Sequence, residues 1–191
     1  PLIAFDELIS RTATLLAPMM ETAPLALKRA IRLAITHWES VGLVEKVFHQ
    51  GTALLTFIHK TFCEFVASRF LVNNRHDLKL IEEVIDHPDR QEVLNFAVGL
   101  GLADTLIKVY LTRHAAGCPG QLQPALLMLG NRDVDVSEAS AQELIQQSFK
   151  AVEDGATDKF SIGLALSDVS ARTGHLVESL AVSKLDATDP A

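Results

Sequence analysis

Potential metal-binding and catalytic side chains are few and scattered along this sequence. His59 and Cys63 are four residues apart, as are His114 and Cys118, so each pair would lie on one side of a helix. A structural zinc site needs four ligands, and neither pair has a second pair near it in the sequence. The sequence therefore predicts no metal site, and no catalytic set of Ser, His, Asp or Cys residues can be assembled from it.

One segment begins like the loop that binds calcium in EF-hands. Asn131, Asp133 and Asp135 alternate along the chain as oxygen ligands do in that loop. Val136, however, occupies the position that requires glycine, and Gln142 the position that should supply a bidentate glutamate. We therefore expect an ordinary loop here, followed by a helix.

The first part of the chain alternates between helical and extended patterns. Apolar residues three and four apart predict amphipathic helices, and short β-branched segments around the turn residue Gly51 predict a hairpin. The predicted elements are, in order, helices at 2–17 and 25–41, strands at 43–48 and 53–58, and a helix from residue 59. Helix, two-stranded wing and helix are the outline of a winged-helix domain.

Beyond residue 77 the apolar residues have helical spacing only. The predicted helices are 78–86, 90–102, 104–116, 121–129, 138–153, 158–173 and 175–185. Short loops containing Gly, Pro or Asp separate them, which is typical of an α-solenoid or an irregular bundle. Because no clean internal repeat is present, any HEAT-like character is degenerate.

Charge divides the chain into the same two parts. Residues 1–77 carry eight basic and seven acidic side chains, whereas residues 78–191 carry nine and seventeen. With the polar run 73–77, this shift predicts a winged-helix-like domain at 1–77 and an α-helical, degenerate HEAT-like region at 78–191. The expected fold class is mainly α, with one β-hairpin.

The segment 57–71 resembles the end of the winged-helix domain in NACHT-type STAND NTPases, the group that includes NOD-like receptors. In that family the segment reads Phe-(Leu/Ile)-His, two residues, then Phe-Gln-Glu-(Phe/Tyr). The matching residues are Phe57, His59, Phe62, Glu64, Phe65, Ala67 and Leu71. Residues 92–100 resemble the family's first repeat after the winged helix. The resemblance covers about residues 25–102, and Cys63 departs from it by replacing the usual Gln.

The resemblance implies a nucleotide-sensing role for His59. In the family this histidine reaches the β-phosphate of ADP and helps hold the inactive state, and an imidazole N–H is suited to donate to a phosphate oxygen. The alternative is that His59 merely begins a helix with its ring half-buried. We expect Phe62, Phe65 and Phe70 to be core residues. Glu64 could cap, or pair with Arg69 or Lys60 across the helix surface, but we expect a solvated surface acid.

The sequence contains no Gly-x-x-x-x-Gly-Lys-(Ser/Thr) phosphate loop, so this chain alone is not expected to be an enzyme or to hold a cofactor. The resemblance implies a C-terminal fragment of a longer protein. Its upstream NTPase domain would bind ATP or ADP with Mg²⁺ and make the full-length protein an ATPase. That domain and an unidentified ligand or protein trigger are the expected partners, and the expected setting is immunity or anti-phage defence.

The alternative function is a winged-helix DNA-binding regulator with a helical effector domain. Lys28, Arg29 and Arg32 on the second predicted helix, with Lys46 in the wing, would then contact phosphates. A net charge of −7 opposes this interpretation, because a nucleic acid attracts a basic surface. We therefore do not expect nucleic acid to be the partner.

Composition also indicates a compartment. The chain has 191 residues, 48% of them hydrophobic, which is enough for a substantial core. Its two cysteines cannot form a disulfide framework, and no stretch reaches 18 uninterrupted apolar residues. The start at Pro1 has no initiator Met and no charged leader region. We expect a cytoplasmic protein that does not bind a membrane.

Overall fold

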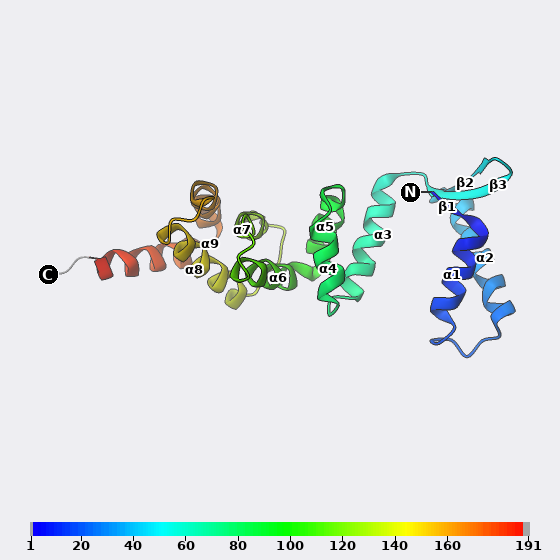
Figure 1. The fold of residues 1–191 in the computed structure, drawn as a ribbon, viewed down its shortest axis with the longest axis horizontal. Coiled ribbons are helices and arrows are strands. Elements are labelled where there is room, and N and C mark those ends of the chain that lie inside the picture. The colour runs from blue at the N-terminus through cyan, green and yellow to red at the C-terminus, as the bar shows by residue number, and fades with distance from the viewer. Residues whose placement is uncertain (1, 189–191) are drawn as a thin grey trace. The chain divides into compact units, whose positions relative to one another are not determined.

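The computed structural model describes residues 2–188, which form two compact units that divide between Val66 and Ala67. The chain is mainly helical and has one small sheet (Figure 1). The predicted fold class, mainly α with a β-hairpin, is confirmed.

The first unit combines two helices with a three-stranded antiparallel sheet. Its elements are β1 (Ile3–Ala4), α1 (Phe5–Leu16), α2 (Pro24–Ser40), β2 (Val44–His49) and β3 (Thr52–Phe57). The strand order is β1-β3-β2, so β3 is central and the predicted hairpin forms one side of the sheet. The expected first helix is corrected at its start, because Ile3 and Ala4 pair with β3 before α1 begins.

The hairpin turn explains the register of β2 and β3. Gln50 and Gly51 both have positive φ, +48° and +77°, which is typical of the two-residue turns whose twist matches that of the strands. His49 therefore pairs with Thr52 directly across the turn. The apolar sides of both helices and of the sheet meet in one core, made of Ile9, Ala13, Leu27, Ile31, Ile35, Val44 and Leu55.

Helix α3 (Lys60–Asn73) follows the sheet. Its last turns belong to the second unit, since Leu71 and Val72 are buried in that unit's core. The polar run 73–77, which predicts a boundary, consists of the last residue of α3 and the connection to α4. The compact units therefore divide within α3, because the apolar residues on both sides of that polar run pack into the same core.

The second unit is built from helices that pack mostly against near neighbours in the sequence. They are α4 (Leu78–Ile85), the 3₁₀ turn η1 (Pro88–Arg90), α5 (Gln91–Ala97), the π-helical turn η2 (Val98–Leu102), α6 (Ala103–Ala115), α7 (Leu122–Gly130), α8 (Glu138–Glu153) and α9 (Lys159–Thr188). Each helix predicted beyond residue 77 is present. The last two are joined in α9, which is bent where Thr173 leaves the helical conformation.

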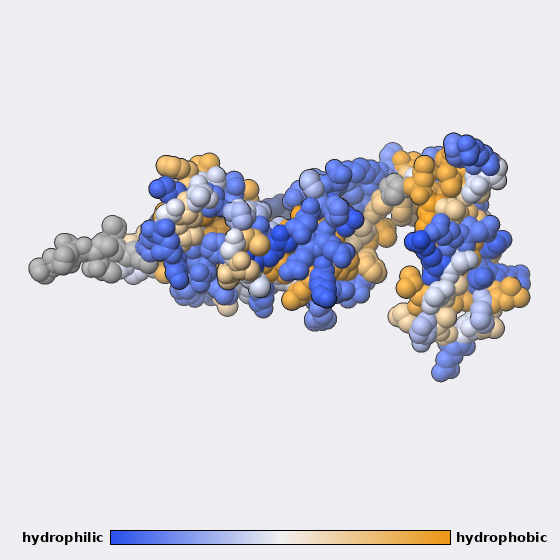
Figure 2. All heavy atoms as spheres, viewed as in Figure 1, coloured by the Kyte–Doolittle hydropathy of each residue, from blue (hydrophilic) through white to orange (hydrophobic). Residues whose placement is uncertain are grey.

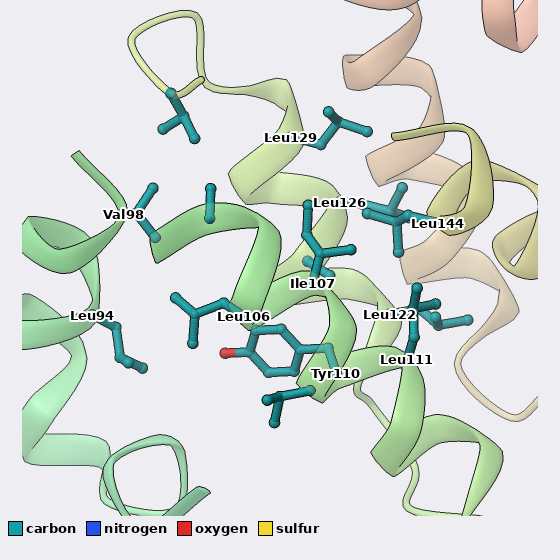
Figure 3. Packing of buried hydrophobic residues seen from close by; sticks show 14 of the residues in the cluster. Leu94, Val98, Leu106, Ile107, Tyr110, Leu111, Leu122, Leu126, Leu129 and Leu144 are labelled. Atoms are coloured by element: carbon teal, nitrogen blue, oxygen red, sulfur yellow. The ribbon is translucent and has the colours of Figure 1, made fainter. Parts of the chain in front are cut away.

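A single apolar core runs through this unit (Figure 3). Its largest fully buried side chains come from every part of the unit and include Leu71, Ile81, Leu102, Ile107, Leu126, Leu144 and Ile162. The core exists because each helix turns its apolar stripe toward its neighbours, as helices in a stacked array must.

Polar contacts join helices that are distant in the sequence. The Asp104 carboxylate of α6 accepts hydrogen bonds from the Ser137 amide at 3.1 Å and from the Ser137 hydroxyl at 3.0 Å, at the start of α8. Burial opposes the charge on Asp104, but hydrogen bonds from Ser140 and Ser137 outweigh it and lower the pKa of the carboxyl group. Asp104 therefore remains ionised near neutral pH and ties α6 to α8.

Among the described residues, one helical run, Pro88–Ala115, has the length and composition of a membrane span. It has 28 residues and a mean hydropathy of 1.4 in its most apolar window, of which 56% is buried within the fold. Gly101, with φ of +92°, bends the run between α5 and α6. Core helices of soluble proteins pass the same test, so this run is weak evidence for a span.

Candidate functional site

His59 lies between the last residue of β3 and the first turn of α3. The Ile58 amide donates to the Leu43 carbonyl at 3.2 Å, so the edge pairing of the hairpin continues to the residue before His59. The His59 carbonyl accepts a hydrogen bond from the Phe62 amide at 3.1 Å. Its imidazole is exposed and meets the Phe62 ring edge-on, with 5.7 Å between centroids. The backbone is therefore held in place while the ring faces solvent and is not half-buried.

The aromatic row of α3 faces outward, so the expectation that it belongs to the core is wrong. Phe62, Phe65 and Phe70 are 39%, 38% and 59% exposed. The opposite side of the helix carries Glu64 and Ser68, which are both buried. Both sides of α3 carry apolar residues, and the side that packs against the rest of the fold is the one that holds Glu64 and Ser68. Figure 2 shows further hydrophobic side chains at the surface of the first unit.

Glu64 is buried, and the expectation of a solvated acid is therefore wrong. Its carboxylate oxygen Oε1 lies 3.0 Å from the Lys60 ammonium one turn earlier, and its side chain is 10% exposed. Lys60 itself is 74% exposed, so solvent weakens the attraction between the two charges. Of the two pairings that the sequence allows for Glu64, the one with Lys60 is present.

Two of the four basic residues named for the DNA-binding alternative are paired with carboxylates. The Arg32 guanidinium lies 3.0 Å from Asp6, and the Lys46 ammonium lies 2.7 Å from Glu39. Both cations also approach the face of the Phe5 ring, at 5.9 and 4.7 Å from its centroid. Binding of a phosphate would therefore compete with contacts that these side chains already make.

Lys28 and Arg29 are the other two basic residues, and both are exposed on α2. Two adjacent cations give a small electrostatic footprint, because nucleic-acid affinity rises with the number of phosphates that are neutralised. The placement of the four residues therefore gives the DNA-binding alternative less support than their sequence spacing does.

Within residues 2–188, no group of three or more His, Cys, Asp or Glu side chains is arranged to hold a metal ion. Cys63 and Cys118 are free, partly buried thiols. The calcium-like segment is a loop, as expected, in which the Asn131 side chain accepts a hydrogen bond from the Asp133 amide at 3.1 Å. Such a local turn uses the side-chain oxygen that a cation would need.

Arg172 of α9 holds this same loop, and sequence reasoning did not identify it. Its guanidinium donates to the backbone carbonyl of Leu129 at 2.9 Å and to the carbonyls of Asn131 and Val134. These carbonyls lie at and just beyond the end of α7, where no later residue of the helix supplies an N–H donor. The only signal in the sequence is a lone arginine in a helix with few other charges, which does not reveal its partner.

A polar cleft of about 790 Å³ lies between α6 and α8. Lys108, His114 and Lys150 line it together with the acids Glu143 and Asp154. Because both signs of charge are present, the lining selects neither an anionic nor a cationic ligand. The lining of this cleft therefore indicates no class of ligand.

Comparison of the chain with models of known protein families, with curated proteins and with solved structures found no match.

Proposed function

We propose that this chain is a non-catalytic regulatory part of a NACHT-like STAND NTPase. In this proposal the first unit is a winged-helix-like domain that stabilises the ADP-bound inactive state through His59. The second, helical unit senses a ligand or binds a protein, in immune or anti-phage defence in the cytoplasm. A nucleotide-binding domain elsewhere in the full-length protein supplies the phosphate loop, holds ATP or ADP with Mg²⁺, and is the first partner of His59.

The observation that carries the proposal is the position of His59 at the start of α3. Its ring is exposed, while backbone hydrogen bonds fix the chain on both sides of it. Helix α3 has 14 residues, so the partial positive charge at its N-terminus favours a nearby anion. An exposed imidazole N–H at such a place is suited to donate to a phosphate that another domain presents.

The outward aromatic row of α3 gives the proposal a second support. Phe62, Phe65 and Phe70 are all exposed along α3. Large aromatic side chains that share one exposed side of a helix are typical of a surface that another domain covers. In the proposed arrangement the nucleotide-binding domain packs on this row and brings its nucleotide to His59.

The test uses the protein encoded by the complete reading frame. We expect it to contain a phosphate loop and to co-purify with ADP. His59→Ala should speed the release of a fluorescent ADP analogue about tenfold or more, because a hydrogen bond to a charged phosphate is lost. His49→Ala is the matched control, since His49 is also exposed and ends β2 in the same unit. Its release rate should equal that of the unaltered protein.

Two results would contradict the proposal. One is a complete reading frame without a phosphate loop, and the other is equal ADP release from the His59 and His49 variants. Fluorescence anisotropy with duplex DNA then tests the alternative. If binding weakens with salt and with replacement of Lys28 and Arg29 by Gln, the chain is a DNA-binding regulator.

A further inference from the structure

A groove of about 580 Å³ opens in the second unit among α5, α6, α7 and the loop after α7. Its walls are mainly apolar and include Leu94, Leu106 and Leu127. The polar groups that line it are the side-chain amides of two Asn and one Gln residue and the Tyr110 phenol, and none of its lining residues is Asp, Glu, Lys or Arg. The groove therefore differs from the charged cleft between α6 and α8 in being electrically neutral.

Tyr110 presents in this groove a hydroxyl group that has no partner among the described residues. The residue is 6% exposed, and its hydroxyl makes no hydrogen bond to the described residues. Figure 3 shows the ring extending from α6 with its oxygen directed toward the side on which Leu94 lies. The oxygen is not among the fully buried atoms that lack a partner, so it reaches the open space of the groove, where a ligand can accept its hydrogen bond. Burial raises the pKa of Tyr110, so the group remains a neutral phenol that can donate a proton in a hydrogen bond.

The groove has a fixed wall on the side of the loop. Asn131 and Val134 line it, and both have their backbone carbonyls held by the Arg172 guanidinium. Val98, at the beginning of the π-helical turn η2, lines it from the side of α5. A site whose walls are held by the fold binds without the entropic cost of ordering a loop.

We infer that this groove binds a small, uncharged, mainly apolar molecule that offers a hydrogen-bond acceptor to the Tyr110 hydroxyl. Its volume lies within the range of roughly 300–1,000 Å³ that is typical of small-molecule sites. A charged ligand is disfavoured because it would lose water without gaining an opposite charge. This inference concerns the second unit alone and does not depend on the proposed function.

The composition of the chain makes a direct test possible. Tyr110 is its one tyrosine, so protein labelled with 3-fluorotyrosine gives a single ¹⁹F resonance from the groove. The probe is Nile red, which is uncharged, mainly apolar and carries a carbonyl acceptor. We expect the ¹⁹F resonance to shift with Nile red concentration and to saturate.

Two variants separate the groove from other apolar surfaces. Leu127→Trp fills the mouth of the groove, where Leu127 is 52% exposed, and should abolish the ¹⁹F shift. Leu164→Trp is the matched control, because Leu164 is 69% exposed on α9 and does not line the groove. Tyr110→Phe, followed by Nile red fluorescence, should weaken binding about three- to tenfold through loss of one hydrogen bond.

Circular dichroism first establishes that each variant is folded. The inference is overturned if the ¹⁹F resonance does not respond to Nile red, or if Leu127→Trp and Leu164→Trp respond equally. It is also overturned if Tyr110→Phe binds Nile red as tightly as the unaltered protein, even where the Leu127 variant is unfolded.

Discussion

Arg172 shows how much one side chain can contribute to the stability of a loop when its hydrogen-bond partners are backbone carbonyls. Its donors reach carbonyls at three positions, Leu129, Asn131 and Val134, across the end of α7 and the loop that follows. A carbonyl that loses its partner in a partly buried place costs free energy, because water replaces the donor incompletely. Arg172 therefore fixes both the loop and one wall of the groove.

Arg172→Met should lower the free energy of unfolding of the second unit by about 2–3 kcal/mol, since methionine keeps the apolar stem and removes the donors. Urea denaturation followed by far-UV circular dichroism measures this loss. Arg132→Met is the control, because Arg132 is exposed in the same loop, and it should change stability by less than about 0.5 kcal/mol. Equal losses in the two variants would show that the carbonyl contacts contribute nothing.

The junction of α5 and α6 depends on one glycine conformation. Gly101 has a φ of +92°, which side chains rarely adopt, whereas Gly99 in the same π-helical turn does not have positive φ. Neither glycine has a heavy atom within 4 Å of the place where a Cβ would stand. The two positions therefore differ in backbone strain and not in available space.

Gly101→Ala should destabilise the second unit by about 1–2 kcal/mol, the cost of holding an L-residue in a left-handed conformation. Gly99→Ala should leave stability unchanged or raise it by up to about 1 kcal/mol, because alanine loses less entropy in a helix. Thermal unfolding by circular dichroism compares them. If both substitutions change stability in the same direction and by the same amount, strain at Gly101 does not shape the junction.

At the scale of the whole molecule, the described residues form two apolar cores that have no residue in common. Ile35 is 2% exposed in the first core, and Leu144 is fully buried in the second. The chain has one tryptophan, Trp38 on α2 in the first unit, and one tyrosine, Tyr110 on α6 in the second. Each unit therefore has its own spectroscopic reporter.

Ile35→Ala should shift the unfolding transition seen by Trp38 fluorescence and leave that of a 3-fluorotyrosine label at Tyr110 in place. Leu144→Ala should do the reverse. Each substitution removes a buried aliphatic side chain and should cost about 2–5 kcal/mol within its own unit. If both reporters shift together in either variant, the chain unfolds as one cooperative body despite its two cores.

The sequence alone determined most of the helices and strands of this protein, because the signals for them are local. Apolar spacing located the helices beyond residue 77, and the turn around Gly51 located the hairpin. The resemblance of segment 57–71 to a family motif also identified His59 as a candidate site residue. The short strand Ile3–Ala4 was missed, since two residues carry no periodicity and only pairing with β3 defines them.

Only the tertiary structure decided which sides of these elements are covered. Both sides of α3 carry apolar residues, so its spacing could not predict that Ser68 is buried while Phe70 is exposed. Likewise Arg172 meets carbonyls about forty positions earlier in the chain, and Tyr110 faces a groove formed by three helices. The burial and the hydrogen-bond partners of a side chain depend on residues that are distant in the sequence, whereas apolar periodicity depends only on residues that are close in the sequence.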